Sequence, residues 1–202
     1  MKIAPPTPEN IAHAAELLNH GELVIVPTET VYGVAARADS AQAMERLYAA
    51  KGRAASKRIA FLVANLDAAR TVGVRVCLGA ERIAKRFWPG PLTMVLQHGN
   101  GDWDGFRVPE HPVALAWLGL LDGLPAVTSA NRSGMSPAHT AREAMDALAP
   151  HVCFALDAGP AEGRPSTVIK VHVDRIELLR EGPIPLAAIQ AAACGAPIRP
   201  GP

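Results

Sequence analysis

Basic side chains crowd one short segment whose residue types suit an anionic ligand. Lys51, Arg53, Lys57 and Arg58 place four cations within eight positions. They are enough to neutralise a polyphosphate, and a guanidinium matches phosphate geometry with two parallel hydrogen bonds. The same cations could instead complement the carboxyl end of a helix dipole. Taken alone, this segment favours the second interpretation.

Hydroxyl and amide groups mark two further segments, each directly after a β-rich run. The first reads PTETVYG at residues 27–33, and the second reads TSANRSG at residues 128–134. Polar groups at the carboxyl end of a strand lie where α/β sheets bind ligands, and Ser129 and Asn131 could bond closely to a polar one. A turn in which the threonines of the first segment only cap backbone groups is an equally good interpretation.

Three more segments differ in whether they indicate a structural or a ligand-binding role. WPGPLT at residues 88–93 places two prolines around a glycine and predicts a rigid structural turn. Arg107 precedes a turn bracketed by prolines and is a candidate anion ligand, whereas His111 reads as a turn or capping residue and not as a catalytic base. The last segment joins Ser166 to a later strand that ends at Arg180.

Composition narrows the classes of function. The chain has 202 residues, a net charge of +1 and 4% aromatic residues, so it predicts one soluble domain. A uniformly basic nucleic-acid binder and an aromatic stacking platform are both disfavoured. Three separated cysteines indicate neither a zinc knuckle nor a disulfide framework. No phosphate-binding loop, dinucleotide-binding glycine motif or HExxH motif is present, and we expect no protein-bound metal.

Cellular location is expected to be the cytoplasm. The first ten residues lack the apolar core of a signal peptide. The longest apolar run, residues 113–121, is too short to cross a bilayer. We therefore expect no membrane partner.

Strands and helices alternate along the chain and predict a single α/β domain with a mixed sheet. A first helix is expected after Thr7 and before Gly21, and a second from Ser40 to about Gly52. We assign residues 1–185 to the catalytic domain and 186–202 to a C-terminal helix with a frayed tail. Further strands are expected at 23–26, 59–63, 92–96, 126–128, 152–156, 167–171 and 175–179, the last two as a hairpin, and further helices at 79–87, 113–121, 141–148 and 186–193.

Taken in order, the polar segments resemble the YrdC/Sua5 family, the threonylcarbamoyl-AMP synthases, in the short bacterial form without an extra C-terminal domain. The resemblance runs from Gly21 to about Pro183. It rests on six motifs: PTETVYG at 27–33, K-x-R at 51–53, WPGPLT at 88–93, R-x-P-x-H-P at 107–112, S-x-N-x-S-G at 129–134 and PSTV at 165–168.

This resemblance implies a twisted open α/β sheet flanked by helices around a concave, positively lined cleft. It implies an enzyme, L-threonylcarbamoyladenylate synthase, a nucleotidyltransferase that forms threonylcarbamoyl-AMP and pyrophosphate from L-threonine, bicarbonate and ATP. Mg²⁺ would accompany the ATP. The product would serve the t6A modification at position 37 of tRNA. Direct contact with tRNA stays open, and proteins of the later transfer step are implied by the family alone.

The same resemblance assigns roles to individual residues. The catalytic signature is carried over to Lys51, Arg53, Ser129 and Asn131. ATP binding is carried over to Arg53, Lys57, Ser129, Asn131 and Arg180, and threonine binding to Thr30, Arg107 and Ser166.

Two positions depart from the pattern of long family members. Lys57 replaces an asparagine, and Leu62 replaces a histidine that contacts threonine; the role of Ser136 is open. Two other functions also stay open. One is a nucleotide- or RNA-binding module of the same fold without synthase activity, and the other is a paralogue that makes a carbamoyl adenylate. Pyrophosphate release that requires both threonine and bicarbonate distinguishes the synthase from them.

Overall fold

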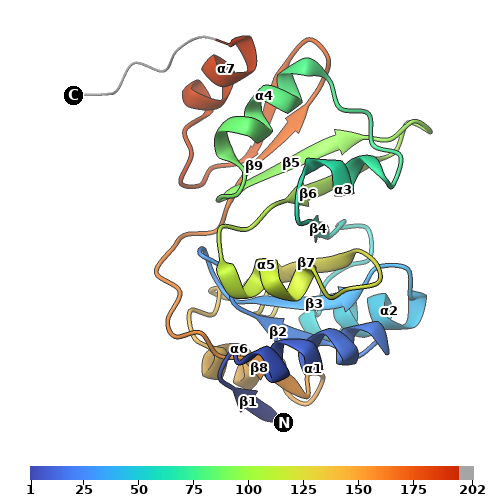
Figure 1. The fold of residues 1–202 in the computed structure, drawn as a ribbon, viewed down its shortest axis with the longest axis vertical. Helices are drawn as coiled ribbons and strands as arrows, with labels where there is room; N and C mark the ends of the chain where they lie inside the picture. Colours follow the sequence, from blue (N-terminus) through green and yellow to red (C-terminus); the bar gives the residue numbers. More distant parts are fainter. Residues whose placement is uncertain (196–202) are drawn as a thin grey trace.

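The computed structural model describes residues 1–195, so the end of the predicted frayed tail lies outside the described residues. Ten strands form one mixed sheet in the spatial order β1-β8-β2-β3-β7-β4-β6-β5-β9-β10 (Figure 1). The strands are β1 (Lys2–Ala4), β2 (Val24–Val26), β3 (Gly33–Arg37), β4 (Ala60–Leu62), β5 (Leu92–Gln97), β6 (Trp103–Arg107), β7 (Pro125–Ser129), β8 (Phe154–Leu156), β9 (Thr167–Val171) and β10 (Ile176–Arg180).

Seven helices in the described residues flank this sheet, and their ends follow from local chemistry. Thr7 and Ser40 accept hydrogen bonds from backbone N–H groups three residues on, as predicted for N-caps. Gly52 ends the second helix with a φ of 57°, a conformation that glycine adopts without penalty. The helices are α1 (Pro8–Asn19), α2 (Ala41–Lys51), α3 (Leu66–Arg70), α4 (Leu78–Phe87), α5 (Pro112–Leu118), α6 (Ala141–Leu148) and α7 (Leu186–Cys194).

The predicted α/β architecture is confirmed, and so is the late hairpin of β9 with β10. Four elements lie outside the expected ranges: β1, β3, β6 and α3. The sequence of β3, GVAAR, has little intrinsic strand preference. It forms a strand because β2 pairs with it on one side and β7 on the other. This pairing is a tertiary effect that a local pattern does not reveal.

The first half-sheet, comprising β1, β8, β2, β3 and β7, is covered by helices on both faces. In β2, Ile25 packs in the cluster that contains residues of α2 and α6. Its neighbours Val24 and Val26 pack in the cluster that contains residues of α1 and α5. Because both faces of β2 are buried, its residues are all apolar and do not alternate between apolar and polar.

The second half-sheet, comprising β6, β5, β9 and β10, is covered on one face only. Leu92, Met94 and Leu96 of β5 pack in one cluster with residues of α4 and α7. The intervening residues Thr93 and Val95 line a cleft on the other face. The period of two along the strand therefore separates core from cleft.

The short strand β4 joins the two half-sheets, pairing with β7 on one side and β6 on the other. In Figure 1 the halves lie one above the other, with β4 between them. Within residues 1–195, no helix is long and apolar enough to cross a membrane. The same residues hold no group of three or more His, Cys, Asp or Glu placed to bind a metal ion.

Candidate active site

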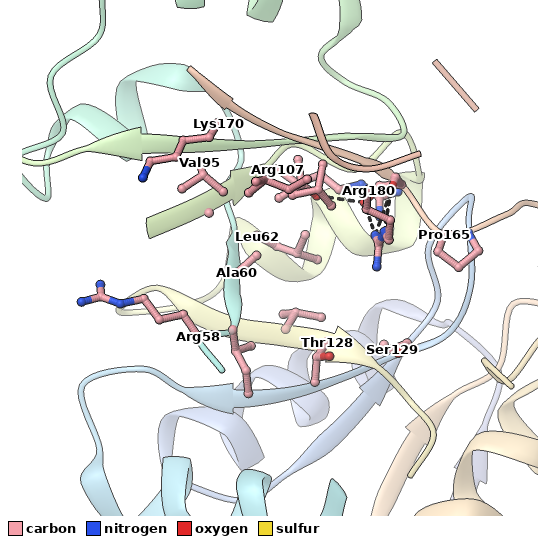
Figure 2. A pocket seen from close by; sticks show the side chains of 18 of the residues that line it. Arg58, Ala60, Leu62, Val95, Arg107, Thr128, Ser129, Pro165, Lys170 and Arg180 are labelled. Atoms are coloured by element: carbon pink, nitrogen blue, oxygen red, sulfur yellow. Dashed lines mark hydrogen bonds between the residues drawn. The ribbon is translucent and has the colours of Figure 1, made fainter. Parts of the chain in front are cut away.

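A cleft of about 680 Å³ lies along β4 between the two half-sheets. Figure 2 shows Arg107 and Arg180 on one wall, Thr128 and Ser129 on the other, and Ala60 and Leu62 of β4 between them. Two acidic side chains, Asp102 and Glu177, line it together with five basic ones: Arg53, Arg58, Arg107, Lys170 and Arg180.

Arg107, at the end of β6, is held in place by three groups. Its side chain is buried, with the residue only 8% exposed. Nε donates to the carbonyl oxygen of Gly90 at 3.1 Å, Nη1 donates to the Thr30 hydroxyl at 2.9 Å, and Nη2 lies 2.7 Å from a carboxylate oxygen of Glu29. Buried charges persist when they are paired and hydrogen-bonded: Arg107 is paired with Glu29 and hydrogen-bonded through Nε and Nη1, whereas Nη2 and the Glu29 carboxylate oxygens have no hydrogen-bond partner among residues 1–195.

The WPGPLT turn explains how Gly90 reaches Arg107. The amide of Gly90 donates to the carbonyl of Val108, and its own carbonyl accepts from Arg107. A Cβ at Gly90 would lie 2.6 Å from the carbonyl oxygen of Phe87, so a side chain does not fit. The turn is structural, as predicted, and what it positions is a cleft residue.

Thr30 lies in the loop after β2, as the sequence predicted, and it is only 1% exposed while lining the cleft. Its hydroxyl lies 2.9 Å from that of Thr28, which in turn donates to the carbonyl of Val31 at 2.7 Å. A Cβ at Gly163 would lie 2.7 Å from the Cα of Thr30, so the loop before β9 packs directly on this segment.

Ser166 and Arg180 meet on the wall formed by β9 and β10. Arg180 donates to the carbonyl of Ser166 through Nε and Nη2, and Nη2 also donates to the Ser166 hydroxyl at 3.0 Å. Burial lowers the pKa of Arg180, and the positive charge of Arg107 lowers it further. The hydroxyls of Ser166 and Thr93 lie 2.9 Å apart.

The K-x-R and S-x-N motifs meet through Lys51, which ends α2. Its Nζ donates to the carbonyl oxygens of Ser129 at 2.5 Å and Asn131 at 2.6 Å. The amide of Ser133 donates to the carbonyl of Lys51, which fixes the loop a second time. Lys51 is 2% exposed, and burial, with a smaller effect of the Arg53 charge, lowers its pKa to about 8.

Asn131 closes its own loop. Its Nδ2 donates to the carbonyls of Arg132 at 2.8 Å and Met135 at 2.7 Å, while Oδ1 is buried and has no hydrogen-bond partner among residues 1–195. Because both partners are carbonyls, the donor must be the amide nitrogen. Neither Lys51 nor Asn131 is among the residues that line the cleft, whereas Ser129 is.

In the segment after Lys51, the basic side chains that line the cleft are not the same ones that the sequence predicted as ATP ligands. Arg53 lines the cleft and donates to the carbonyls of Lys57 and Arg58. Lys57, an expected ATP ligand, is exposed and is not among the lining residues. Arg58 does line the cleft, held by the Asp104 carboxylate at 2.7 Å.

Sequence reasoning missed several residues at this cleft. Glu29 belongs to the PTETVYG motif but was given no role, and it pairs with Arg107. Thr93 and Lys170 alternate with core residues along β5 and β9, a signal that marks the second face of each strand. Leu62, at the position where the resemblance implied a histidine in long family members, lines the cleft as an apolar group. His111 begins α5 without making a cap, and burial lowers its pKa.

Comparison with known proteins identifies relatives over most of the chain. The Sua5/YciO/YrdC family model, described as "Telomere recombination", matches residues 16–182. A protein of Mycobacterium tuberculosis is 36% identical over 184 residues, which cover 86% of this chain and 84% of that protein. The threonylcarbamoyl-AMP synthase of Pyrococcus abyssi is 37% identical over 188 residues, covering 88% of this chain and 55% of its own length.

A solved structure agrees with these sequence matches. The structure of P. abyssi Sua5 in complex with L-threonine is similar with a TM-score of 0.83 and 33% identity. The match covers 90% of this chain and 56% of that one. This chain therefore spans little more than half the length of the P. abyssi protein.

Proposed function

Since this chain belongs to the Sua5/YciO/YrdC family, we propose that it is a threonylcarbamoyl-AMP synthase acting on L-threonine, bicarbonate and ATP. The observation that carries the proposal is the cleft wall formed by Arg107, Arg180, Ser166 and Thr30, which combines the buried cation of Arg107 and the exposed cation of Arg180 with hydroxyl groups. Threonine is the ligand named for the similar P. abyssi structure.

The proposed chemistry requires positioning and charge compensation more than a protein nucleophile. The threonine amine combines with bicarbonate to form a carbamate and water. A carbamate oxygen then attacks the α-phosphorus of ATP, and pyrophosphate leaves. Because carboxylate, carbamate and phosphates are all anionic, the basic groups of the cleft would offset charge as it concentrates at the reacting atoms.

Different parts of the cleft would take different substrates. Arg107 and Ser166 would hold the amino acid, since both belong to the wall that contains Thr30. Arg53 and Arg180 would face the phosphates. Lys51 and Asn131 would act from behind this surface by holding the loop of Ser129.

Magnesium would enter the cleft with ATP. The carboxylates among the lining residues are Asp102 and Glu177, and most oxygen ligands would have to come from the phosphates and water. When bound, the ion would neutralise phosphate charge during transfer. We further propose that the product serves tRNA t6A modification through separate transfer proteins. We propose the cytoplasm as the place where it acts.

Pyrophosphate release tests the proposal directly. The purified chain with ATP and Mg²⁺ should release pyrophosphate only when both L-threonine and bicarbonate are present, and mass spectrometry should detect threonylcarbamoyl-AMP. Release with a carbamoyl donor in place of both threonine and bicarbonate would identify a carbamoyl-adenylate paralogue. Nucleotide or RNA binding without any pyrophosphate release would identify a binding module and contradict the synthase.

A further inference from the structure

The loop after α2 (residues 52–58) is joined to the hairpin of β5 and β6 by one side chain, that of Arg58. Its Nη1 donates to the Asp104 carboxylate at 2.7 Å and to the carbonyl oxygen of Trp103 at 2.9 Å. Its Nη2 lies 3.5 Å from a carboxylate oxygen of Asp102. Within residues 1–195, the loop makes no other hydrogen bond or salt bridge to any segment beyond α2 and itself.

The hairpin offers these acceptors in a fixed arrangement. Asn100 Nδ2 donates to Oδ2 of Asp102 at 2.9 Å, and the Asp102 amide donates back to Asn100 Oδ1 at 3.0 Å. Oδ2 of Asp104 lies 3.0 Å from Nε2 of His98. Each carboxylate therefore contacts a hairpin neighbour through Oδ2 and leaves Oδ1 for Arg58. Acceptors that are held in place beforehand lose little entropy when the bond forms.

The backbone of Arg58 extends this connection to Arg53. Arg53 Nη2 donates to the carbonyl oxygen of Arg58 at 3.1 Å, and Nε donates to that of Lys57 at 3.1 Å. Arg58 thus bonds to the hairpin through its side chain and to Arg53 through its carbonyl. Since Arg53 lines the cleft, the direction of its guanidinium depends on where Arg58 is held.

We propose that Arg58 is a positioning residue, which holds the loop against the hairpin and thereby directs Arg53 toward the phosphates of ATP. This inference rests on the proposed function, in which Arg53 faces those phosphates. Every residue of 52–58 except Arg53 is exposed, and the next buried residue is Ile59. Without the bonds of Arg58, the loop would have to become ordered when ATP binds, and that ordering would lower the affinity.

Direct contact of Arg58 with a phosphate is the alternative, because Arg58 also lines the cleft. Figure 2 shows Arg58 and Lys170 at one end of the cleft, with Ser129 and Pro165 at the other. The two roles predict opposite effects of removing the Asp104 charge. If Arg58 binds phosphate, the loss of a nearby carboxylate should strengthen ATP binding, since it removes a repulsion and releases the cation. If Arg58 positions the loop, the same loss should weaken ATP binding.

Calorimetric titration with ATP and Mg²⁺ measures this sign. We expect Asp104→Asn and Arg58→Ala each to bind ATP at least threefold more weakly than the wild-type chain. The double variant should bind no more weakly than Arg58→Ala, because both changes break the same contact. Asp39→Asn is the matched control, since it removes a carboxylate from the surface pair with Arg37 and should leave ATP affinity within twofold of wild type. An Asp104→Asn affinity within threefold of wild type, or above it, would overturn the proposal, and so would additive losses in the double variant.

Limited trypsin digestion measures the order of the loop without ATP. Asp104→Asn leaves the sequence of the loop unchanged, so its trypsin sites are those of wild type. Cleavage after Lys57 should be at least threefold faster in Asp104→Asn than in wild type or Asp39→Asn. Cleavage after Lys85, which is exposed on α4, serves as the internal reference for global unfolding. Equal rates after Lys57 would show that the loop is held without Arg58 and would overturn the proposal.

ATP binding and pyrophosphate release distinguish this inference from the proposed function. A chain whose variants lose ATP affinity and gain cleavage as expected, but which releases no pyrophosphate, contradicts the synthase and supports the role of Arg58. A chain that makes threonylcarbamoyl-AMP, but whose Asp104→Asn variant binds ATP as tightly as wild type, contradicts the role of Arg58 and leaves the synthase standing.

Discussion

The ammonium nitrogen of Lys51 lies 2.6 Å from the carbonyl oxygen of Asn131, deep behind the wall of the cleft. This hydrogen bond joins the end of α2 to the loop after β7, two segments 80 residues apart in the chain. Lys51 reaches backbone atoms and not the open cleft, so its role in this geometry is to hold the loop that carries Ser129. Its removal should therefore affect stability as well as activity.

The pH dependence of stability isolates the charge on Lys51. Its pKa is lowered from 10.5 to about 8 by burial, so between these values the unfolded chain binds more protons at this residue than the folded chain does. Stability contributed by this residue therefore rises with pH across that window. Urea unfolding at pH 7.5 and 9.5 should show wild type gaining stability relative to Lys51→Met. The exposed Lys85→Met variant should show no such difference from wild type.

Arg53 should matter for turnover more than for stability. Its guanidinium lines the cleft and, in the described part of the chain, bonds only to carbonyls of its own loop. Arg53→Ala should lower kcat/KM for ATP at least tenfold, since that loss requires only about 1.4 kcal/mol of transition-state stabilisation. Lys57→Ala should cost less, and Arg86→Ala, an exposed change on α4, should leave steady-state kinetics unchanged. Wild-type kinetics in Arg53→Ala would contradict its assignment to the phosphates.

Substitution of Asn131 tests whether activity requires the hydrogen bonds that this side chain makes within the S-x-N loop. Asn131→Ala removes two hydrogen bonds to carbonyls, and about 1 kcal/mol of lost stability should lower the thermal midpoint by a few degrees. Asn131→Asp should cost more, because a carboxylate cannot donate to the carbonyls of Arg132 and Met135. ATP affinity, measured by titration, should fall at least tenfold in both variants. Wild-type ATP affinity in a destabilised variant would restrict Asn131 to a scaffold role.

Glu29 should be required to keep Arg107 in place. Glu29→Gln removes the partner of a buried guanidinium, and breaking such a pair typically costs about 3 kcal/mol. In a chain of this size the thermal midpoint should fall by roughly 6–12 °C. Asp39→Asn is the matched control, because it breaks the Arg37 pair at the surface and should cost less than about 1 kcal/mol. Equal midpoints for the two variants would contradict the structural role of Glu29.

Sequence patterns alone located most of the elements and the segments that meet at the cleft. The caps at Thr7 and Ser40, the helix end at Gly52 and the β9–β10 hairpin depend on residues close in the chain. For that reason local spacing predicted them. Family resemblance, read from six motifs, added the sites at Thr30, Arg107, Ser166 and Arg180, which the fold brings to one wall.

Only the tertiary structure decided which side chains face the cleft and which support it. Whether Lys51 meets a ligand or a backbone carbonyl depends on where the loop after β7 passes α2. The positions of Lys57 outside the cleft and Arg58 inside it depend on the hydrogen bonds that shape their loop. Likewise, Thr30 meets its hydrogen-bond donor Arg107 across 77 residues of chain. Such contacts depend on packing between distant segments, which residue types and spacing do not specify.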